Sequence, residues 1–306
     1  MPRYRASLSF LGAALILACL SACRSSEFFA ANAPIAFSHV ERRVNLAYGT
    51  DPRQKLDVYV PRLAMNRPVV IFWYGGSWQE GSKADYRFVG TALAKLGFVA
   101  VLPDYRLYPQ VVFPLFDEDG AHAVAWVEQH IREFGGDPQR IVLMGHSAGG
   151  HTAAFLALNH AFLQHFGANP SNIVGLIGLS GPYALVPDSD ALRSAFAPPF
   201  SEKDWQPIRF VDSHAPPTLL LHGLSDKEVL PQETIALHDA LVQNDVRVEM
   251  HLFPHRGHAD TVAPFALLLR WRTPVVDEVA AFVRSVAAEP KAGKLQPQPN
   301  VTECVE

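Results

Sequence analysis

The sequence predicts an α/β fold in which one mostly parallel central sheet carries helices on both faces. Short apolar runs rich in β-branched and aromatic residues recur along the chain, as expected for strands buried on both faces. Segments with helical periodicity separate several of these runs, and such alternation favours parallel strand pairing. With 306 residues, 49% of them hydrophobic, the chain can bury one large core. The predicted strands are 56–60, 68–74, 98–105, 140–145, 173–181, 217–223 and 246–253.

The N-terminal segment predicts export. Arg3 and Arg5 precede an apolar run over 8–20, which is shorter than the ~20 residues that a membrane-spanning helix needs, and small residues follow it. These features are typical of a secretory signal peptide. The last four residues of the segment, LSAC ending at Cys23, resemble a bacterial lipoprotein lipobox. That resemblance implies cleavage before Cys23 and acylation of its thiol, and a plain signal peptide with an incidental cysteine is the alternative.

The remaining divisions of the chain follow from composition. The irregular stretch over about 183–214 is rich in Pro, Phe and Trp and predicts a small lid inserted in the main domain. We expect the protein to lie in the cell envelope, held to a membrane through Cys23, and Arg24 favours the outer membrane where the source has one. The predicted divisions are a signal peptide over 1–22, a lipid-anchored tether over 23–40, the α/β domain over 41–288 and a disordered polar tail over 289–306.

Helical segments and charge complete the general prediction. Apolar residues recur at helical spacing in 121–135, 232–244 and 275–287, and a further helix is expected directly after the strand over 140–145. The formal net charge of −4 is spread without a basic stripe, which argues against a nucleic-acid partner. The sequence leaves the oligomeric state open.

A serine ringed by small residues marks the candidate catalytic centre. Ser147 lies in Gly145-x-Ser147-x-Gly149, between the strand over 140–145 and the following helix. In such a sharp turn, small neighbours relieve crowding and the hydroxyl stands above the C-terminal edge of the sheet. The adjacent helix N-terminus stabilises negative charge. This placement predicts that Ser147 is a nucleophile, although the motif alone also arises by chance.

A nucleophilic serine needs a base, and the base needs an orienting carboxylate. Such sheets present them in the chain order serine, acid, histidine. Asp226 follows the strand over 217–223, and His258 follows the strand over 246–253. Both loops leave the edge at which Ser147 is expected, because the strands are predicted to be parallel. We therefore predict that Asp226 orients His258 and that His258 is the general base.

Other residues compete for these two positions. Glu228 is an alternative acid, and Asp226 alone could cap the following helix. His255 and His222 are alternative bases. The spacing His255-x-x-His258 with Asp260 could also bind a metal, but zinc motifs of this length normally lie on helices. No metal site is predicted.

An oxyanion hole requires N–H donors where the substrate carbonyl oxygen becomes negative. One donor is expected from Ala148, the residue after the nucleophile, and the other from the glycine loop after the strand over 68–74, at Gly76 or Ser77. An ordinary glycine turn is the alternative interpretation of this loop.

Four motifs recur in one known group of proteins. They are YGGSW at 74–78, PDYRLYPQVVFP at 103–114, GGDPQRIVLMGHSAGGH at 135–151 and LLLHGLSDKEV at 219–229. Together they resemble the α/β-hydrolase esterases, in particular the branch related to hormone-sensitive lipase, the polysaccharide-esterase-like hydrolases and the kynurenine formamidases. The resemblance extends from about 40 to 287. It implies an α/β-hydrolase fold and hydrolysis of carboxylic esters through an acyl-serine intermediate, without a metal or organic cofactor.

One position departs from the family pattern. The family usually has His-Gly-Gly-x-Trp, and this chain has Tyr74 where the histidine stands. The two glycines of the pattern are retained. His146, Asp104 and Arg106 also match the family, and we interpret them as structural residues that support the site.

The sequence therefore predicts a lipid-anchored serine esterase acting on small-molecule esters with short acyl or small aryl groups. Trp78 and Tyr183 are predicted to contact the substrate, with Phe200 and Trp205 as further candidates, although each could equally be a core residue. An arylformamidase using the same residues is the alternative enzyme. A non-catalytic envelope binding protein on the same scaffold is the alternative outside catalysis.

Overall fold

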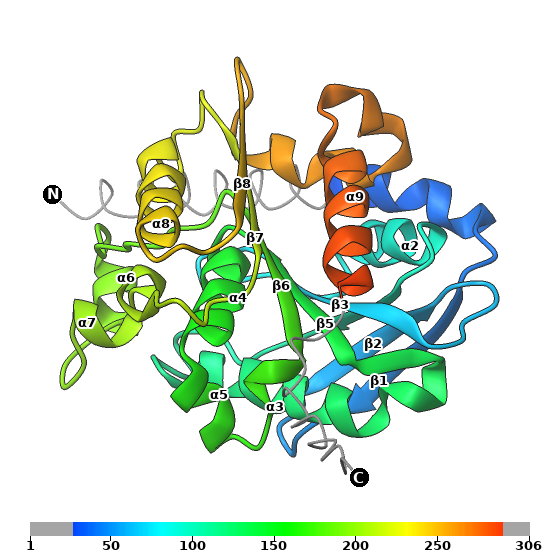
Figure 1. Cartoon of the computed structure of the whole chain (residues 1–306), viewed down its shortest axis with the longest axis horizontal. Coiled ribbons are helices and arrows are strands. Elements are labelled where there is room, and N and C mark those ends of the chain that lie inside the picture. The colour runs from blue at the N-terminus through cyan, green and yellow to red at the C-terminus, as the bar shows by residue number, and fades with distance from the viewer. Residues whose placement is uncertain (1–26, 290–306) are drawn as a thin grey trace, which may run out of the picture.

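The computed structural model describes residues 27–289 and contains an eight-stranded sheet of order β1-β2-β4-β3-β5-β6-β7-β8. β1 and β2 pair antiparallel with their neighbours, and the strands from β4 to β8 are parallel (Figure 1). The mostly parallel α/β prediction is confirmed. The strands are β1 (Glu41–Ala47), β2 (Lys55–Val60), β3 (Arg67–Trp73), β4 (Val99–Pro103), β5 (Gly136–His146), β6 (Ile173–Leu179), β7 (Thr218–Gly223) and β8 (Val248–Phe253).

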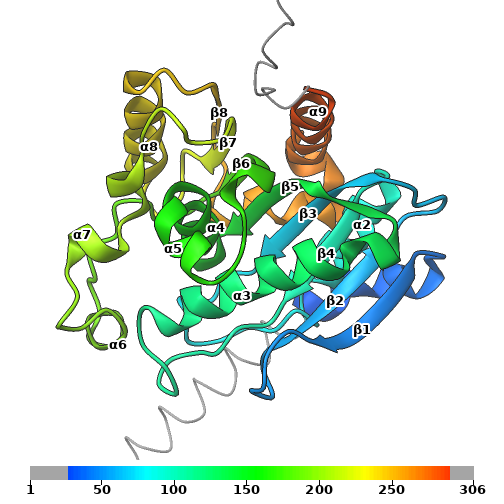
Figure 2. The ribbon, with the colours of Figure 1, turned by 60° about the horizontal axis from the view of Figure 1, so that its bottom comes forward.

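Helices cover both faces of this sheet. α2 and α9 pack on one face, and α3, α4 and α8 on the other (Figures 1 and 2). Among the helices of residues 27–289, none combines the length and the apolar character that crossing a bilayer requires. The α-helices are α2 (Arg87–Lys95), α3 (Leu115–His130), α4 (Ala148–Leu158), α5 (His160–His165), α6 (Asp190–Ala195), α7 (Glu202–Trp205), α8 (Pro231–Gln243) and α9 (Val275–Ala288). The 3₁₀ helices are η1 (Ala33–Phe37), η2 (Ile131–Phe134), η3 (Pro170–Asn172), η4 (Pro207–Phe210), η5 (His258–Thr261), η6 (Ala263–Phe265) and η7 (Leu267–Arg272).

Each predicted strand has a counterpart in the sheet, but several other elements differ from the expectation. β1 was not predicted, because this edge strand is mostly exposed and lacks a buried apolar run. α2 was not predicted either. α3 begins at Leu115, well before the expected start at 121. Its first turns were not predicted because they carry Asp117 and Asp119, which are buried despite their charge.

The stretch predicted as a lid contains α6, α7 and η4, beside α4 and α5 in Figure 1. It is fastened to the main domain by hydrogen bonds. The Phe113 N–H donates to the Ala195 carbonyl, and Nε2 of the buried His151 lies 2.8 Å from the Trp205 carbonyl oxygen. Whether this segment moves as a lid stays a prediction. The predicted signal peptide, Cys23 and nearly all of the predicted tail lie outside the described residues.

Candidate active site

Ser147 occupies a strained turn between β5 and α4. Its φ of 56° and ψ of −126° lie in a region that side-chain-bearing residues rarely adopt. The neighbouring backbone is too close for larger residues, since a Cβ on Gly145 would lie 1.9 Å from the Gly149 carbonyl oxygen. The Ser147 N–H donates to the Leu179 carbonyl of β6, which ties the turn to the sheet. Such strain persists only where the surrounding structure imposes it, and it is a feature of catalytic serines.

Asp226 and His258 come together at the same edge. Nδ1 of His258 lies 2.8 Å from Oδ2 of Asp226, and the other carboxylate oxygen accepts the backbone N–H groups of Glu228 and Val229. Burial by itself raises the pKa of Asp226, but hydrogen bonds from His222 and His258 outweigh it and hold that pKa below its usual range. Asp226 is therefore an ionised carboxylate that can orient an imidazole and stabilise its charged form.

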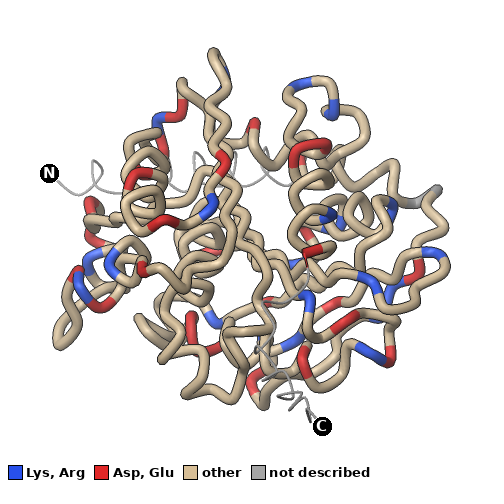
Figure 3. Tube along the Cα trace, viewed as in Figure 1, with Lys and Arg blue, Asp and Glu red and all other residues tan. Residues whose placement is uncertain are grey.

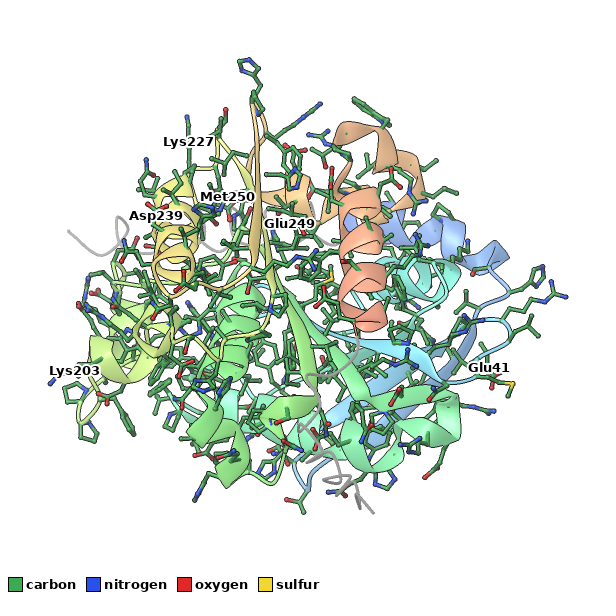
Figure 4. All side chains as sticks on the ribbon, in the orientation of Figure 1. Glu41, Lys203, Lys227, Asp239, Glu249 and Met250 are labelled. Carbon is green, nitrogen blue, oxygen red and sulfur yellow. The ribbon has the colours of Figure 1, made fainter. Side chains whose placement is uncertain are left out.

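The two residues leave neighbouring strands. β7 and β8 pair in parallel, and Asp226 and His258 lie in the segments that follow them. Figure 4 labels Lys227 on the loop after β7 and Met250 on β8, the neighbouring strand. Parallel pairing brings residues 32 positions apart in the chain into one hydrogen bond.

The base loop also packs against the nucleophile turn through His146. Nε2 of His146 lies 3.1 Å from the His258 carbonyl oxygen, and the two rings are 4.7 Å apart between centroids. Burial, with a smaller contribution from the nearby His258, lowers the pKa of His146 to about 3, so its ring is neutral and Nε2–H donates. Because His146 immediately precedes Ser147, this contact holds the predicted base beside the predicted nucleophile.

The glycine loop after β3 lies against the same turn. A Cβ on Gly75 would lie 2.8 Å from the Ser147 Cβ. Gly76, Ser77 and Trp78 then have φ values of 133°, 51° and 58°, which turn successive peptide groups in an unusual direction. Within residues 27–289, the N–H groups of Gly76, Ser77 and Ala148 donate to no protein acceptor. Unpaired donors beside a strained serine are what an oxyanion hole requires.

Tyr74, the departure from the family pattern, is fixed by a buried polar network. Its hydroxyl donates to Oδ1 of Asp104 at 3.0 Å and accepts from the Arg53 guanidinium at 2.8 Å. Its ring stacks on Tyr105, with centroids 4.8 Å apart, and the Tyr105 hydroxyl donates to the Tyr74 carbonyl. The loop is therefore anchored at its first residue, although the histidine of the family is absent.

Further ionic contacts support this network. Asp104 accepts the Lys83 N–H at 2.7 Å, and Arg106 pairs with the fully buried Asp119 at 2.7 Å. Asp104 and Arg106 were predicted as supporting residues, whereas Lys83 and Asp119 were not. No local signal marks the latter two, since both are charged residues that only the fold buries.

The predicted substrate residues lie in the interior. Trp78 is 2% exposed and meets the rings of Phe196 and His151 at 4.8 and 5.1 Å, edge to face. Tyr183 is fully buried, and Trp205 is 6% exposed. The complete burial of Tyr183 favours its interpretation as a core residue. Direct contact of these residues with a substrate stays a prediction.

The competing residues occupy other positions. The Glu228 carboxylate is exposed and lies 3.8 Å from Nε2 of His258, on the opposite side of the ring from Asp226. His255 is exposed, in a turn where its φ is 58°. Neither has the geometry that Asp226 and His258 share.

The described residues offer no set of side chains that could bind a metal ion. Asp260 accepts the Gly257 N–H with one carboxylate oxygen and pairs with Arg272 through the other. Across residues 27–289, no group of three or more His, Cys, Asp or Glu side chains is placed to hold a metal ion. Acidic and basic residues interleave along the trace of residues 27–289 (Figure 3).

The chain is similar to a known protein family and to several esterases. The BD-FAE family model matches residues 56–241. An isoprenylcysteine alpha-carbonyl methylesterase of Arabidopsis thaliana is 34% identical over 247 residues, which are 73% of this chain and 58% of that protein. Esterase LipC of Mycobacterium tuberculosis is 33% identical over 271 residues, which are 81% of this chain and 66% of that protein. The chain thus spans less than two thirds of the length of these curated relatives.

Solved structures share the architecture. An inhibited esterase B from Lactobacillus rhamnosis matches with a TM-score of 0.75, over 92% of this chain and 97% of that one, at 21% identity. Esterase 2 of Thermogutta terrifontis matches with a TM-score of 0.66 over 81% of this chain and 94% of that one, at 24% identity. At these identities the likeness shows the fold.

Proposed function

The chain belongs to the BD-FAE family and has the α/β-hydrolase fold, and on that premise we propose that it is a serine esterase. It cleaves carboxylic esters through an acyl-serine intermediate. The observation that carries this proposal is the 2.8 Å contact between Nδ1 of His258 and Asp226, in a loop that packs on the residue next to Ser147. Curated relatives of the chain are named as esterases, which supports the same chemistry.

The reaction has two half-steps. Ser147 Oγ attacks the ester carbonyl carbon while Nε2 of His258 takes the hydroxyl proton, and the same proton then leaves with the alcohol. Water repeats the sequence on the acyl-serine and releases the acid. Asp226 holds Nδ1–H throughout and stabilises the imidazolium. The N–H groups of Gly76, Ser77 and Ala148 stabilise the oxyanion in both half-steps; unlike the Gly76 and Ser77 donors, that of Ala148 also lies at the N-terminus of α4.

The proposed substrate is a small ester with a short acyl or small aryl group, and no cofactor takes part. The support is the aromatic cluster around Trp78, where Phe116, Phe196 and His151 already fill the surrounding volume. A series of p-nitrophenyl esters of increasing acyl length tests the size limit, and we expect kcat/KM to fall beyond short chains. Parallel turnover of N-formylkynurenine separates an esterase from an arylformamidase.

Ser147→Ala tests the mechanism. We expect kcat toward p-nitrophenyl acetate to fall about a million-fold, because removing the nucleophile disables the whole group of residues that act together. A fluorophosphonate probe should label Ser147 and no other serine. Ser225→Ala, at an exposed serine next to Asp226, is the matched control and should keep its activity. Ester turnover by Ser147→Ala close to that of the control would exclude the mechanism.

We also propose that the protein is exported and held in the cell envelope by acylated Cys23. The support is the basic, apolar and small-residue order of 1–22 followed by LSAC. Several acyl chains would anchor it firmly, since each buried CH₂ contributes about 0.8 kcal/mol. Cys23→Ser should abolish incorporation of labelled palmitate, and the wild type should carry that label. An unlabelled wild-type protein would leave only the plain signal peptide.

A further inference from the structure

A second imidazole contacts the carboxylate of Asp226. His222, at the end of β7, is fully buried, and its Nε2 lies 3.1 Å from Oδ2 of Asp226, the oxygen that also meets His258. The same Nε2 lies 2.9 Å from the Val229 carbonyl oxygen. Because both of these atoms are acceptors, Nε2 carries a hydrogen and directs its positive end toward Asp226.

The other ring nitrogen fixes the orientation of this imidazole. Nδ1 of His222 lies 2.7 Å from Oγ1 of Thr234, in the first turns of α8, and both residues are fully buried. A ring flip would place Cδ2 at the hydroxyl and Cε1 at Asp226, and both contacts would be lost. Thr234, His222, Asp226 and His258 therefore form one continuous polar chain that ends at the predicted base.

We propose that His222 is a positioning residue that sets the basicity of His258 through Asp226. This inference rests on the proposed function. An N–H beside Oδ2 takes part of the negative charge that would otherwise act on His258, and it fixes the plane of the carboxylate. Without it, Asp226 stabilises the imidazolium more strongly, so His258 holds its proton to higher pH and is oriented less well.

Other charged and titratable groups face the same pair. Glu228 approaches Nε2 of His258, the ring of His146 packs on that of His258, Glu233 of α8 acts on His222, and Asp260 is paired with Arg272. All of them remain in place in the variants below. A comparison between two substitutions at position 222 therefore isolates the contact with Asp226.

His222→Asn and His222→Gln form a matched pair of amides. The shorter Asn reaches the position of Nδ1 and keeps the Thr234 contact, whereas Gln reaches the position of Nε2 and keeps an N–H toward Asp226. We expect the acid limb of the kcat/KM profile to move up by about half a unit to one pH unit in the Asn variant, since that limb reports the base of the free enzyme. Its kcat should fall roughly tenfold, as when a group that orients a reacting one is lost. The Gln variant should keep the wild-type limb.

Thr234→Val controls for packing around His222. It removes the far contact and leaves the Nε2–Asp226 contact, so its acid limb should stay within about 0.2 pH units of the wild type. The proposal is overturned if the acid limb of the kcat/KM profile lies at the same pH in the wild type, His222→Asn and His222→Gln. It is also overturned if Thr234→Val shifts that limb as far as His222→Asn does. If the Asn variant does not fold, His222→Leu combined with Thr234→Val removes the same donor without orphaning the hydroxyl.

An NMR titration of the His258 ring separates this proposal from the proposed function. The midpoint for the ring protons is measured without turnover, and it should move up in the Asn variant alone. A wild type that neither hydrolyses activated esters nor reacts with a fluorophosphonate refutes the esterase, whatever the titration shows. An unmoved midpoint in an active Asn variant refutes the role of His222 and leaves the esterase intact.

Discussion

At the scale of single residues, the fold tolerates unfavourable groups in and near the turn that holds Ser147. Ser147 has a left-handed φ of 56°, His146 is a buried ring whose Nδ1 has no partner within residues 27–289, and Asp117 is a fully buried carboxylate. Each costs folding free energy that the large core offsets. Strained and buried polar groups cluster at sites where geometry matters more than stability.

Asp117 gives a pH-dependent prediction. The Thr152 hydroxyl donates to one of its oxygens at 2.8 Å and the other has no partner in the described chain, and burial raises the pKa of Asp117 to about 7. Between pH 4 and 7 the unfolded chain loses this proton before the folded one does, so the free energy of unfolding falls as pH rises and the cost is complete above about 7.

Asp117→Asn removes this cost and keeps an acceptor for Thr152. At pH 8 the variant should be more stable than the wild type by roughly 2–4 kcal/mol, and the advantage should vanish toward pH 4. Urea unfolding at pH 4, 6 and 8 measures both. A stability difference that does not change with pH would contradict the assignment.

At the scale of elements, the predicted oxyanion loop depends on backbone shape more than on side chains. The N–H groups of Gly76 and Ser77 are unpaired because the chain there adopts φ values of 133° and 51°. Both ends of this loop are fixed by hydrogen bonds. At one end the Tyr74 hydroxyl donates to Asp104, and at the other the Gly76 carbonyl accepts the backbone N–H groups of Gln79 and Glu80. A histidine at position 74 is therefore not essential for holding it.

Gly76→Ala tests the loop. A Cβ there would lie 2.2 Å from the Glu80 carbonyl oxygen, at a φ that alanine disfavours, so the loop must move. We expect kcat to fall about 10²–10³-fold, the usual effect of a lost oxyanion donor. Gly97→Ala is the matched control, since it has a φ of 96° but nothing within 4 Å of the added carbon. Equal kcat values in the two variants would remove the loop from catalysis.

Sequence patterns failed to predict the edge strand β1, the helix α2 and the first turns of α3. β1 has almost no buried side chain, so its residues carry no alternating apolar signal. The early part of α3 was missed because burial of Asp117 and Asp119 reverses the usual relation between charge and exposure. Elements with two buried faces, such as β5 to β7, were predicted because their composition alone marks them.

At the scale of the whole molecule, the site exists because parallel strands end at one edge. Ser147 follows β5, Asp226 follows β7, His258 follows β8, and the glycine loop follows β3. The strand order places β3 next to β5 and β7 next to β8, with β6 between the two pairs. Four segments spread over more than 180 residues therefore meet at the same edge of the sheet, where the parallel strands end.

The cap formed by α6, α7 and η4 is also a property of the whole molecule. Phe113 contacts Phe196, Phe200 and Trp205 with ring centroids 5.1 to 6.2 Å apart, which joins the cap to the loop before α3. Composition predicted an irregular aromatic insertion there. Only packing shows that its rings are mostly interior, which limits the space for a substrate near Trp78.

The sequence by itself determined the strands of the parallel sheet, the turn that holds Ser147 and the two loops that hold Asp226 and His258, because local composition and chain order specify these. The tertiary structure favours Asp226 and His258 over the alternatives Glu228 and His255, since both of the latter are exposed. It also decided the contacts of Tyr74 and His146, whose partners Asp104 and His258 lie 30 and 112 positions away in the chain. Contacts at such separations form only when the sheet is assembled, and no local pattern encodes them.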